Sequence, residues 1–401
     1  MRKFEIRISS TGALKFSIAG RLDTTSSQNF LNVVMSHIGD TTGAAVIIDC
    51  KNLEYISSAG LRAMLTIKKK YSSQIVLTNV SPKIFEILEV TGFSKIFNVS
   101  VADEHINASE IRELTEINGQ LIGSSGGTEI FKVDSDELLK LYPAGRNLSD
   151  VENEMKITKA ALLSGVPTLI SYYIVYYNNR YGLIYEMPNA KTVASMVNFH
   201  EWALNQYAAN MGAALKQIHS CIPEEGIFPK TRDLLLGYLK YSTSYYTNSE
   251  IAKLGDLIRA VHEKNTFIYG SYHAGNVFIQ DDEIILLNMS SASVGNPIFD
   301  LAETYIIHVL ESDIFAKFLM GFEPSRAKMF YDLMIRAYFN DSASIAEQES
   351  MIKAAALLLS ALLPEMGNFT PLQINKFVTL ARQNLFPNFE SYMEILSQAN
   401  F

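Results

Sequence analysis

The chain has 401 residues, of which 48% are apolar and 19% charged, an ordinary globular composition with enough length for two domains. Its formal net charge is −8. Because an acidic chain is repelled by phosphate backbones, we expect no nucleic-acid partner. The two cysteines, Cys50 and Cys221, form no C-x-x-C pair, so we expect neither a disulfide framework nor a metal site.

Nothing in the chain resembles a membrane segment. The first seven residues lack the apolar core of a signal peptide. The longest apolar run, residues 354–363, is interrupted by Ser360 and is too short to span a bilayer. We therefore expect a cytoplasmic protein with no membrane partner.

The first hundred residues carry alternating strand and helix patterns. Period-two alternation, or a run of Val and Ile, predicts strands at 4–8, 13–19, 44–49 and 75–79. Helical periodicity predicts helices at 26–38, 59–72 and 82–91. This order predicts a small α/β domain with a mixed sheet over residues 1–105.

The pattern restarts after a polar segment. Residues 102–116 are predicted as a terminal helix or linker, with 106–116 as the linker proper. Strands are then expected around a Gly-rich turn at 123–127 and again within 169–187, with a helix near 148–164 between them. From about residue 195 the chain is predicted to be mostly helical, interrupted at 267–290, and no internal repeat is evident.

A Ser-Ser-Ala-Gly sequence follows the third predicted strand. Ser57 and Ser58 come directly before a predicted helix, and a serine there is a good N-cap because its oxygen accepts a free backbone N–H. A phosphate at the same place would meet the free N–H groups and the positive end of the helix dipole. The residues alone do not decide between an N-cap and a phosphorylation site.

The surrounding motifs resemble those of STAS domains, the anti-sigma factor antagonist family, over about residues 1–105. The resemblance rests on Ile56–Gly60, Gly20–Asp23, the Thr24-Thr25 helix start and Thr91–Phe93. It implies that Ser58, two positions before Gly60, is the phosphoacceptor. It also implies an anti-sigma factor or a related serine kinase as partner. The acidic residue that often precedes the phosphoserine in that family is Ser57 here.

A second constellation begins at the Gly-rich turn. Residues 122–131 read Ile-Gly-Ser-Ser-Gly-Gly-Thr-Glu-Ile-Phe, and Lys140 follows in the next predicted strand. A Gly-rich turn and a lysine can cover and clamp phosphates. A tight hairpin beside a surface lysine is the structural alternative.

Residues 117–401 resemble the aminoglycoside phosphotransferase-like branch of the protein kinase fold. The resemblance rests on Tyr269–Asn276, on Leu287-Asn288 and on Gly295–Leu301. It implies an α+β bilobal domain, with an N-lobe at about 117–188 and a C-lobe at about 189–401. It also implies that Lys140 pairs with Glu154 rather than its neighbour Glu152, that His273 packs structurally, and that Asp300 holds backbone. Residues that the resemblance assigns to a nucleotide site are Gly123, Gly126, Gly127, Lys140, Glu154, Glu186, Met187 and Asn276.

Two positions depart from the phosphotransferase pattern. Ser271 stands where an Asp accepts the proton of the attacking hydroxyl, and Asn288 stands where an Asp binds metal. A serine hydroxyl cannot replace a carboxylate base, and Mg²⁺ prefers carboxylate oxygens to the neutral oxygens of Asn276 and Asn288. We therefore expect no catalytic residues and no required cofactor. If ATP or another nucleotide binds, we expect binding without firm dependence on Mg²⁺.

These patterns predict a regulatory protein, a Ser-phosphorylated STAS switch fused to a pseudokinase that senses a ligand or docks a partner. One alternative is a phosphotransferase for a small hydroxylated substrate that uses a displaced acid such as Asp281 or Asp282, although a solvated turn is the preferred reading of those two residues. Another alternative is a scaffold that binds neither nucleotide nor anti-sigma factor.

Overall fold

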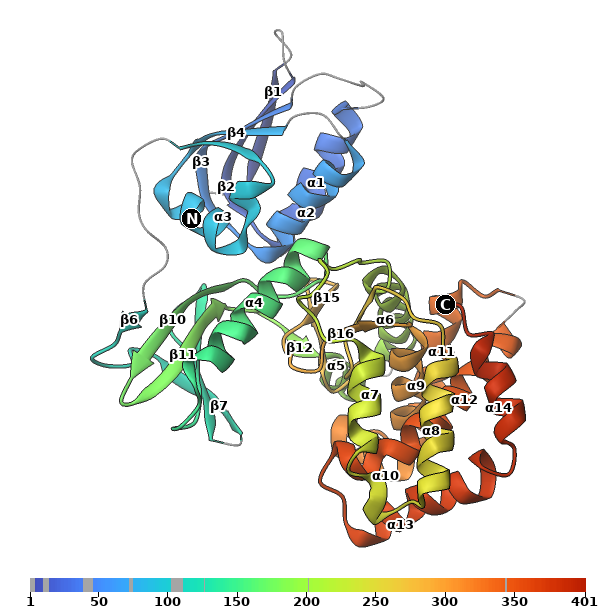
Figure 1. Cartoon of the computed structure of the whole chain (residues 1–401). Coiled ribbons are helices and arrows are strands. Elements are labelled where there is room, and N and C mark those ends of the chain that lie inside the picture. Colours follow the sequence, from blue (N-terminus) through green and yellow to red (C-terminus); the bar gives the residue numbers. More distant parts are fainter. Residues whose placement is uncertain are drawn as a thin grey trace. The chain divides into compact units, whose positions relative to one another are not determined.

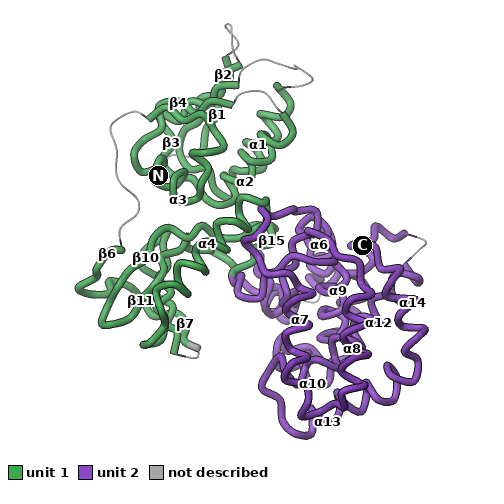
Figure 2. The backbone as a smooth tube through the Cα atoms, viewed as in Figure 1, with its two compact units in different colours: residues 1–190, 280–287 green, residues 191–279, 288–401 purple. Residues whose placement is uncertain are grey.

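The computed structural model describes residues 4–9, 14–38, 46–71, 75–101, 111–125, 127–200, 202–342 and 345–401. The chain divides into two compact units (Figure 2). Unit 1 comprises residues 1–190 and 280–287, and unit 2 comprises 191–279 and 288–401. Unit 1 thus contains both the predicted first domain and the predicted N-lobe, whereas the predicted boundaries at 105 and 117 remain predictions.

A five-stranded mixed sheet opens unit 1 (Figure 1). Its spatial order is β1-β2-β3-β4-β5, with β1 antiparallel to β2 and the other pairs parallel. The strands are β1 Glu5–Ser9, β2 Leu14–Leu22, β3 Val46–Ile56, β4 Ile75–Val80 and β5 Asn98–Val101. The predicted mixed-sheet α/β domain is confirmed, but the sequence did not predict β5, a four-residue strand at the sheet edge.

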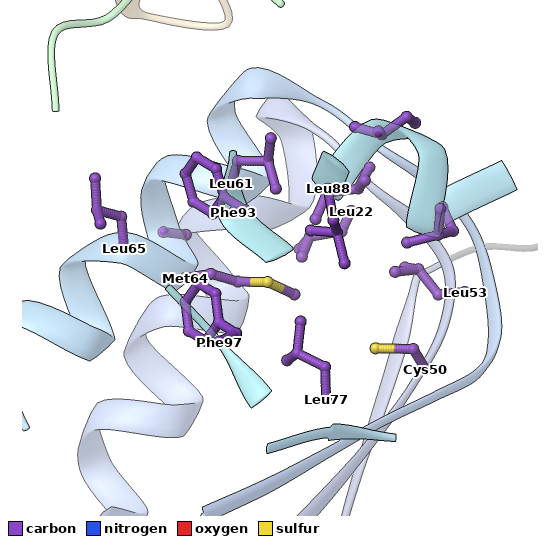
Figure 3. Packing of buried hydrophobic residues seen from close by; sticks show 14 of the residues in the cluster. Leu22, Cys50, Leu53, Leu61, Met64, Leu65, Leu77, Leu88, Phe93 and Phe97 are labelled. Carbon is purple, nitrogen blue, oxygen red and sulfur yellow. The ribbon is translucent and has the colours of Figure 1, made fainter. Parts of the chain in front are cut away.

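Three α-helices accompany this sheet, α1 Thr24–Ile38, α2 Ser58–Lys70 and α3 Pro82–Thr91. All three were predicted, with α1 beginning two residues and α2 one residue earlier than expected. Local chemistry sets the α3 ends: Ser81 caps the start, Pro82 occupies the first turn and Gly92 ends it in the left-handed conformation. Figure 3 shows the apolar core that these elements share, including Leu22, Leu61, Met64 and Phe93.

The second sheet of unit 1 has the order β6-β10-β11-β9-β8-β7. Its strands are β6 Arg112–Glu113, β7 Gln120–Ser125, β8 Thr128–Lys132, β9 Glu137–Leu141, β10 Ser171–Tyr177 and β11 Arg180–Glu186. The helix α4 Leu148–Ser164 has the predicted bounds and ends at Gly165 in the left-handed conformation. Most of the predicted 102–116 segment lies outside the described residues. Its described end is β6, which pairs with β10 and corrects the helix-or-linker prediction there.

A short segment from far along the chain also belongs to unit 1. Strand β15 Glu283–Leu286 contacts the loop before β10, where the Leu286 N–H donates to the Pro167 carbonyl over 2.7 Å. Just before β15, Asp281 and Asp282 adopt φ values of 48° and 64°. Both are exposed, so the prediction of a solvated turn is confirmed.

Unit 2 is predominantly helical, as predicted, and α7, α8 and α12 pack against one another (Figure 1). Two short antiparallel pairs interrupt it, β12 Lys191–Thr192 with β14 Val277–Gln280, and β13 Thr266–Ile268 with β16 Ser293–Gly295. Its helices are α5 Val193–Phe199, α6 Ala203–Ile218, α7 Thr231–Leu239, α8 Asn248–Ala260, α9 Ile298–Tyr305, α10 Ser312–Met320, α11 Pro324–Phe339, α12 Ile345–Met366, α13 Pro371–Leu380 and α14 Phe389–Ser397.

Helix α12 contributes Leu358, Leu359 and Leu362 to the unit 2 core. Within the described ranges, none of the helices combines the length and apolarity that a bilayer crossing needs.

Candidate functional site

Ser57 and Ser58 lie where β3 ends and α2 begins. Ser57 is the N-cap, and its hydroxyl oxygen accepts the Gly60 N–H over 3.3 Å. Ser58 is the first helical residue and is only 2% exposed. Its N–H belongs to the first turn, where no helical carbonyl can accept it. It donates instead to both carboxylate oxygens of Glu186, each at 3.2 Å.

Gly60 fits this turn because the chain passes very close to it. A Cβ at Gly60 would stand 2.5 Å from the Leu22 backbone oxygen and 2.9 Å from the Leu22 side chain. The backbone of Leu22 is fixed in turn by the Ser57 N–H, which donates to the same oxygen over 3.0 Å. A side chain at residue 60 would therefore push α2 away from β2.

We expect Gly60→Ala to lower the unfolding free energy by about 1–3 kcal/mol, because the added methyl overpacks a fixed backbone contact. The measurement is thermal unfolding of the full chain, read at its first transition. Gly237→Ala in α7 is the matched control, since a Cβ there has no neighbour within 4 Å. That control should be neutral or mildly stabilising, and an equal loss in both variants would contradict the packing argument.

The structure brings Lys140 and Glu154 together. Lys140 Nζ on β9 lies 2.6 Å from Glu154 Oε1 on α4, and the Tyr185 hydroxyl donates to the same oxygen over 2.7 Å. Burial tends to raise the pKa of Glu154, but the charge and hydrogen bond of Lys140 outweigh it and lower that pKa. The exposed Glu152 takes no part. The predicted pairing is confirmed, while a role in nucleotide binding stays a prediction.

The segment after β11 has its backbone donors engaged. The N–H of Glu186 donates to Ile170, that of Met187 to Asp136 over 2.7 Å, and that of Asn189 to the Gln280 side chain over 2.9 Å. Pro188 has no N–H. An adenine edge presents acceptor nitrogens beside its amino group and so needs a donor from the protein. Residues 186–189 offer no free backbone donor for it.

The Gly-rich turn is only partly described. Gly123 lies in β7 at an irregularity of the β7–β8 register, and Gly127 precedes β8. The Arg180 guanidinium donates to the Gly127 carbonyl over 3.1 Å, which ties the turn to β11. Gly126 lies outside the described residues.

In unit 2, Asp300 organises the loop that contains Ser271. Its two carboxylate oxygens accept the N–H groups of Tyr269 and Gly270 at 2.8 and 2.7 Å, and His219 Nε2 lies 3.1 Å from it. Gly270 has a φ of 71°, and a Cβ there would lie 2.5 Å from the Ser291 oxygen. The loop backbone is therefore fixed by a fully buried carboxylate and a glycine-specific turn.

The side chain of Asn288 and the backbone carbonyl of Ser271 both form hydrogen bonds with neutral groups. The Asn288 side-chain oxygen accepts the Ser290 N–H over 3.0 Å. The Asn276 side-chain amide donates to the Ser271 carbonyl over 3.1 Å and to the Tyr269 hydroxyl over 3.2 Å. Among the described residues, no cluster of three or more His, Cys, Asp or Glu side chains could hold a metal ion.

His273, two residues after Ser271, is buried in this loop. Burial, together with the neighbouring His308, lowers its pKa to about 3. Its Nδ1 has no hydrogen-bond partner within the described part of the chain. A neutral, packed imidazole agrees with the structural role predicted for it.

A pocket of about 520 Å³ in unit 2 includes Ser271 and His273 in its wall. Most of the remaining wall is apolar, with side chains from α7, α9, α10 and α12, and a polar strip is formed by residues 290–293. Glu303 on α9 adds a carboxyl group whose pKa burial and the nearby Asp300 raise to about 8. Sequence reasoning missed Glu303, whose only signal was a second acidic residue three positions after Asp300 in a short, largely apolar helix.

Comparison with known proteins identifies both parts of the chain. The family model of the STAS domain matches residues 7–108, and that of the phosphotransferase enzyme family matches residues 123–333. A Bordetella bronchiseptica protein named as a candidate anti-sigma factor antagonist, BtrV, is 39% identical over 62 residues, which are 15% of this chain. The match covers 53% of BtrV, so the chain spans about half the length of this curated relative.

The chain is also similar to solved structures of other proteins. A choline/ethanolamine kinase family protein from Mesorhizobium loti is 14% identical with a TM-score of 0.46, over 71% of this chain and 94% of that one. The streptomycin–ATP–APH(2")-IIa ternary complex is 11% identical with a TM-score of 0.44, over 69% and 93%. The family assignment itself rests on the phosphotransferase match, which spans a little over half of the chain. The chain therefore belongs to the phosphotransferase enzyme family and carries a STAS domain at its N-terminal side.

Proposed function

We propose that the protein is a cytoplasmic regulator: a STAS partner switch controlled by phosphorylation of Ser58, joined to a phosphotransferase-family domain that has lost catalysis. The proposed loss of catalysis rests on the side chains at residues 271 and 288. Both side chains are neutral, and Asn288 accepts a backbone N–H from its own turn. Proton abstraction and Mg²⁺ binding by carboxylates are both removed.

The partner-switch half rests on the STAS match and on the start of α2. A phosphate on Ser58 would add nearly two negative charges at a helix N-terminus, enough to repel a partner that binds the neutral surface. The partner proposed is an anti-sigma factor or a related serine kinase. This agrees with the similarity to the Bordetella bronchiseptica protein, which is named as an anti-sigma factor antagonist.

Phosphopeptide mapping tests this half. After incubation of the full chain with ATP and a serine kinase of the anti-sigma factor type, phosphate is expected on Ser58, and Ser58→Ala should abolish it. Ser57→Ala is the matched control, because it removes the N-cap side chain of α2 but keeps the Ser58 hydroxyl that accepts the phosphate. Loss of the cap should lower the stability by about 1 kcal/mol. Phosphate confined to Ser57 would contradict the assignment.

The pocket beside Ser271 supports a ligand-sensing role for the second domain. Its wall is largely apolar and includes the Ser290–Ser293 strip and Glu303. Pockets of this size and lining suit a small molecule with an apolar body and a few hydroxyl or amino groups. The ligand proposed is therefore a small molecule that occupies this pocket without being phosphorylated.

Nucleotide binding, if it occurs, is expected to depend on Lys140 and not on Mg²⁺ or base identity. Lys140 meets phosphates as a point charge, whereas residues 186–189 have no free N–H for a base. Thermal shifts with ATP and GTP should be equal, unchanged by a chelator, and lost in Lys140→Ala/Glu154→Gln. The double variant avoids leaving Glu154 unpaired, and Lys140→Arg is the charge-matched control. A shift that needs both adenine and Mg²⁺ would contradict this.

One observation favours a second candidate function, phosphoryl transfer to a small hydroxylated substrate. Glu303 lines the same pocket as Ser271, and its pKa of about 8 makes it a stronger base than an ordinary carboxylate. Such an enzyme would become faster as pH rises through 8, because the base must be deprotonated, and Glu303→Gln would abolish the activity. Asp281 is less suited to that role, since its carboxylate accepts the Thr24 hydroxyl over 2.6 Å.

A further inference from the structure

The beginning of α2 is surrounded by carboxylates that come from elsewhere in unit 1. Arg21, at the end of β2, donates to both oxygens of Asp136 over 3.2 and 2.7 Å. Arg62 on α2 donates to Glu283 over 3.0 Å. Together with the Ser58–Glu186 contact, three acidic side chains meet three donors of the STAS domain.

The Ser58–Glu186 contact is buried, and the two arginine–carboxylate contacts are partly buried. Glu186 is 5% exposed and also accepts the Ile170 N–H, and burial raises its pKa although the Ser58 side chain hydrogen bonds to it. The Arg21 guanidinium lies over the Tyr55 ring, 3.8 Å from its centre. Hydrogen bonds to charged groups that are partly desolvated are stronger than exposed ion pairs.

The three donors form one surface. Ser58 and Arg62 are four residues apart and so lie on the same face of α2. Arg21 immediately precedes Leu22, whose carbonyl accepts the N–H of Ser57. We call Arg21, Ser57, Ser58 and Arg62 the switch surface, and Asp136, Glu186 and Glu283 the acidic triad.

We propose that the acidic triad is the resting occupant of the switch surface, and that a protein partner must displace it by presenting acidic side chains of its own. The proposal rests on the proposed function, because it concerns the same Ser58. Two arginines and a helix N-terminus favour anionic groups, and the triad satisfies them within the chain. Partner binding and triad docking therefore exclude each other.

Phosphorylation of Ser58 and docking of the triad also exclude each other. A serine kinase would transfer the γ-phosphoryl group of ATP to Ser58 Oγ, which gives up its proton while ADP leaves. Because Ser58 is only 2% exposed, its hydroxyl is inaccessible to a kinase active site, so the triad must first release it. Once attached, the phosphate would stand against the Glu186 carboxylate, and two anions in a buried site repel strongly. The acidic triad therefore cannot dock again on the phosphorylated switch surface.

The test uses hydrogen exchange of the Ser58 amide in the full chain. The Ser58 N–H donates to the Glu186 carboxylate, so its protection from exchange measures whether the acidic triad is docked on the switch surface. The variant Asp136→Arg/Glu283→Arg changes only the triad and leaves the switch surface intact. We expect exchange about 5- to 150-fold faster than in the wild type, the range of typical coupling. Ser58→Asp should have the same effect, and Ser58→Ala should not.

Glu152→Arg is the control, because Glu152 is exposed on α4 and the substitution makes the same charge reversal as either single substitution of the double variant. Unchanged exchange in β10 and β11 establishes that the double variant is folded. A Ser58 amide that exchanges equally fast in wild type and double variant would overturn the proposal. Equal phosphorylation rates of these two chains would also overturn it while leaving the phospho-switch intact. Protection lost as expected, with Ser58 never phosphorylated, would support triad docking and reject the switch.

Discussion

The purified 401-residue chain should turn over ATP at least about 10⁴-fold more slowly than the 1–100 per second typical of kinases. The expected loss has two parts. A positioned base contributes about 10²–10⁴ to the rate, and Ser271 provides none. Metal ions stabilise transition-state charge by several kcal/mol, and Asn288 offers only a neutral oxygen that already accepts the Ser290 N–H.

A coupled ADP-release assay with sugars, aminoglycosides and peptides as acceptors measures this. Ser271→Asp/Asn288→Asp is expected to restore Mg²⁺ binding, because both carboxylates return to their places, and neither single variant should do so. Asn265→Asp is the control, since it adds a carboxylate at an exposed position. Turnover near one per second in the wild type would reject the pseudokinase proposal. Loss of that turnover in Glu303→Gln would then identify the second candidate function.

The parts of the fold that the sequence predicts best have local causes. Helices α3 and α4 have the predicted bounds because a capping serine, an early proline and a closing glycine mark the ends of α3, and Gly165 ends α4. Strands β5 and β6 are short and lie at sheet edges, where little apolar periodicity develops. Their assignment depends on pairing with β4 and β10, which no local pattern encodes.

The site was predictable only as far as its motifs reach. The pairing of Lys140 with Glu154 follows from the family pattern. The engagement of the Asn189 N–H does not, because its acceptor Gln280 is 91 residues away. Likewise, Arg21 and Asp136 are 115 residues apart and look like ordinary surface charges in the sequence. Tertiary contacts of this kind depend on how the two sheets of unit 1 pack.

The largest stability effect is expected at Asp300. Asp300→Ala should lower the unfolding free energy of unit 2 by about 3–5 kcal/mol, because loss of a buried charged hydrogen-bond partner leaves buried donors unsatisfied. Those donors are the N–H groups of Tyr269 and Gly270, and His219 also loses its contact. Asp300→Asn should cost less, since it retains one acceptor oxygen.

Urea unfolding followed by hydrogen exchange of α9 and α11 measures this effect within unit 2. Asp332→Ala is the control: its ion pair with Lys328 is exposed on α11, so about 0.5 kcal/mol or less should be lost. The loop should also lose its geometry, because Gly270 at a φ of 71° is held by the carboxylate that accepts its N–H. If Asp300→Ala matched the control in stability, Asp300 could not be what fixes the Ser271 loop. A large loss in Asp300→Ala with a smaller one in Asp300→Asn would instead locate the effect in hydrogen bonding and not in the negative charge, because asparagine keeps one acceptor for these two N–H groups.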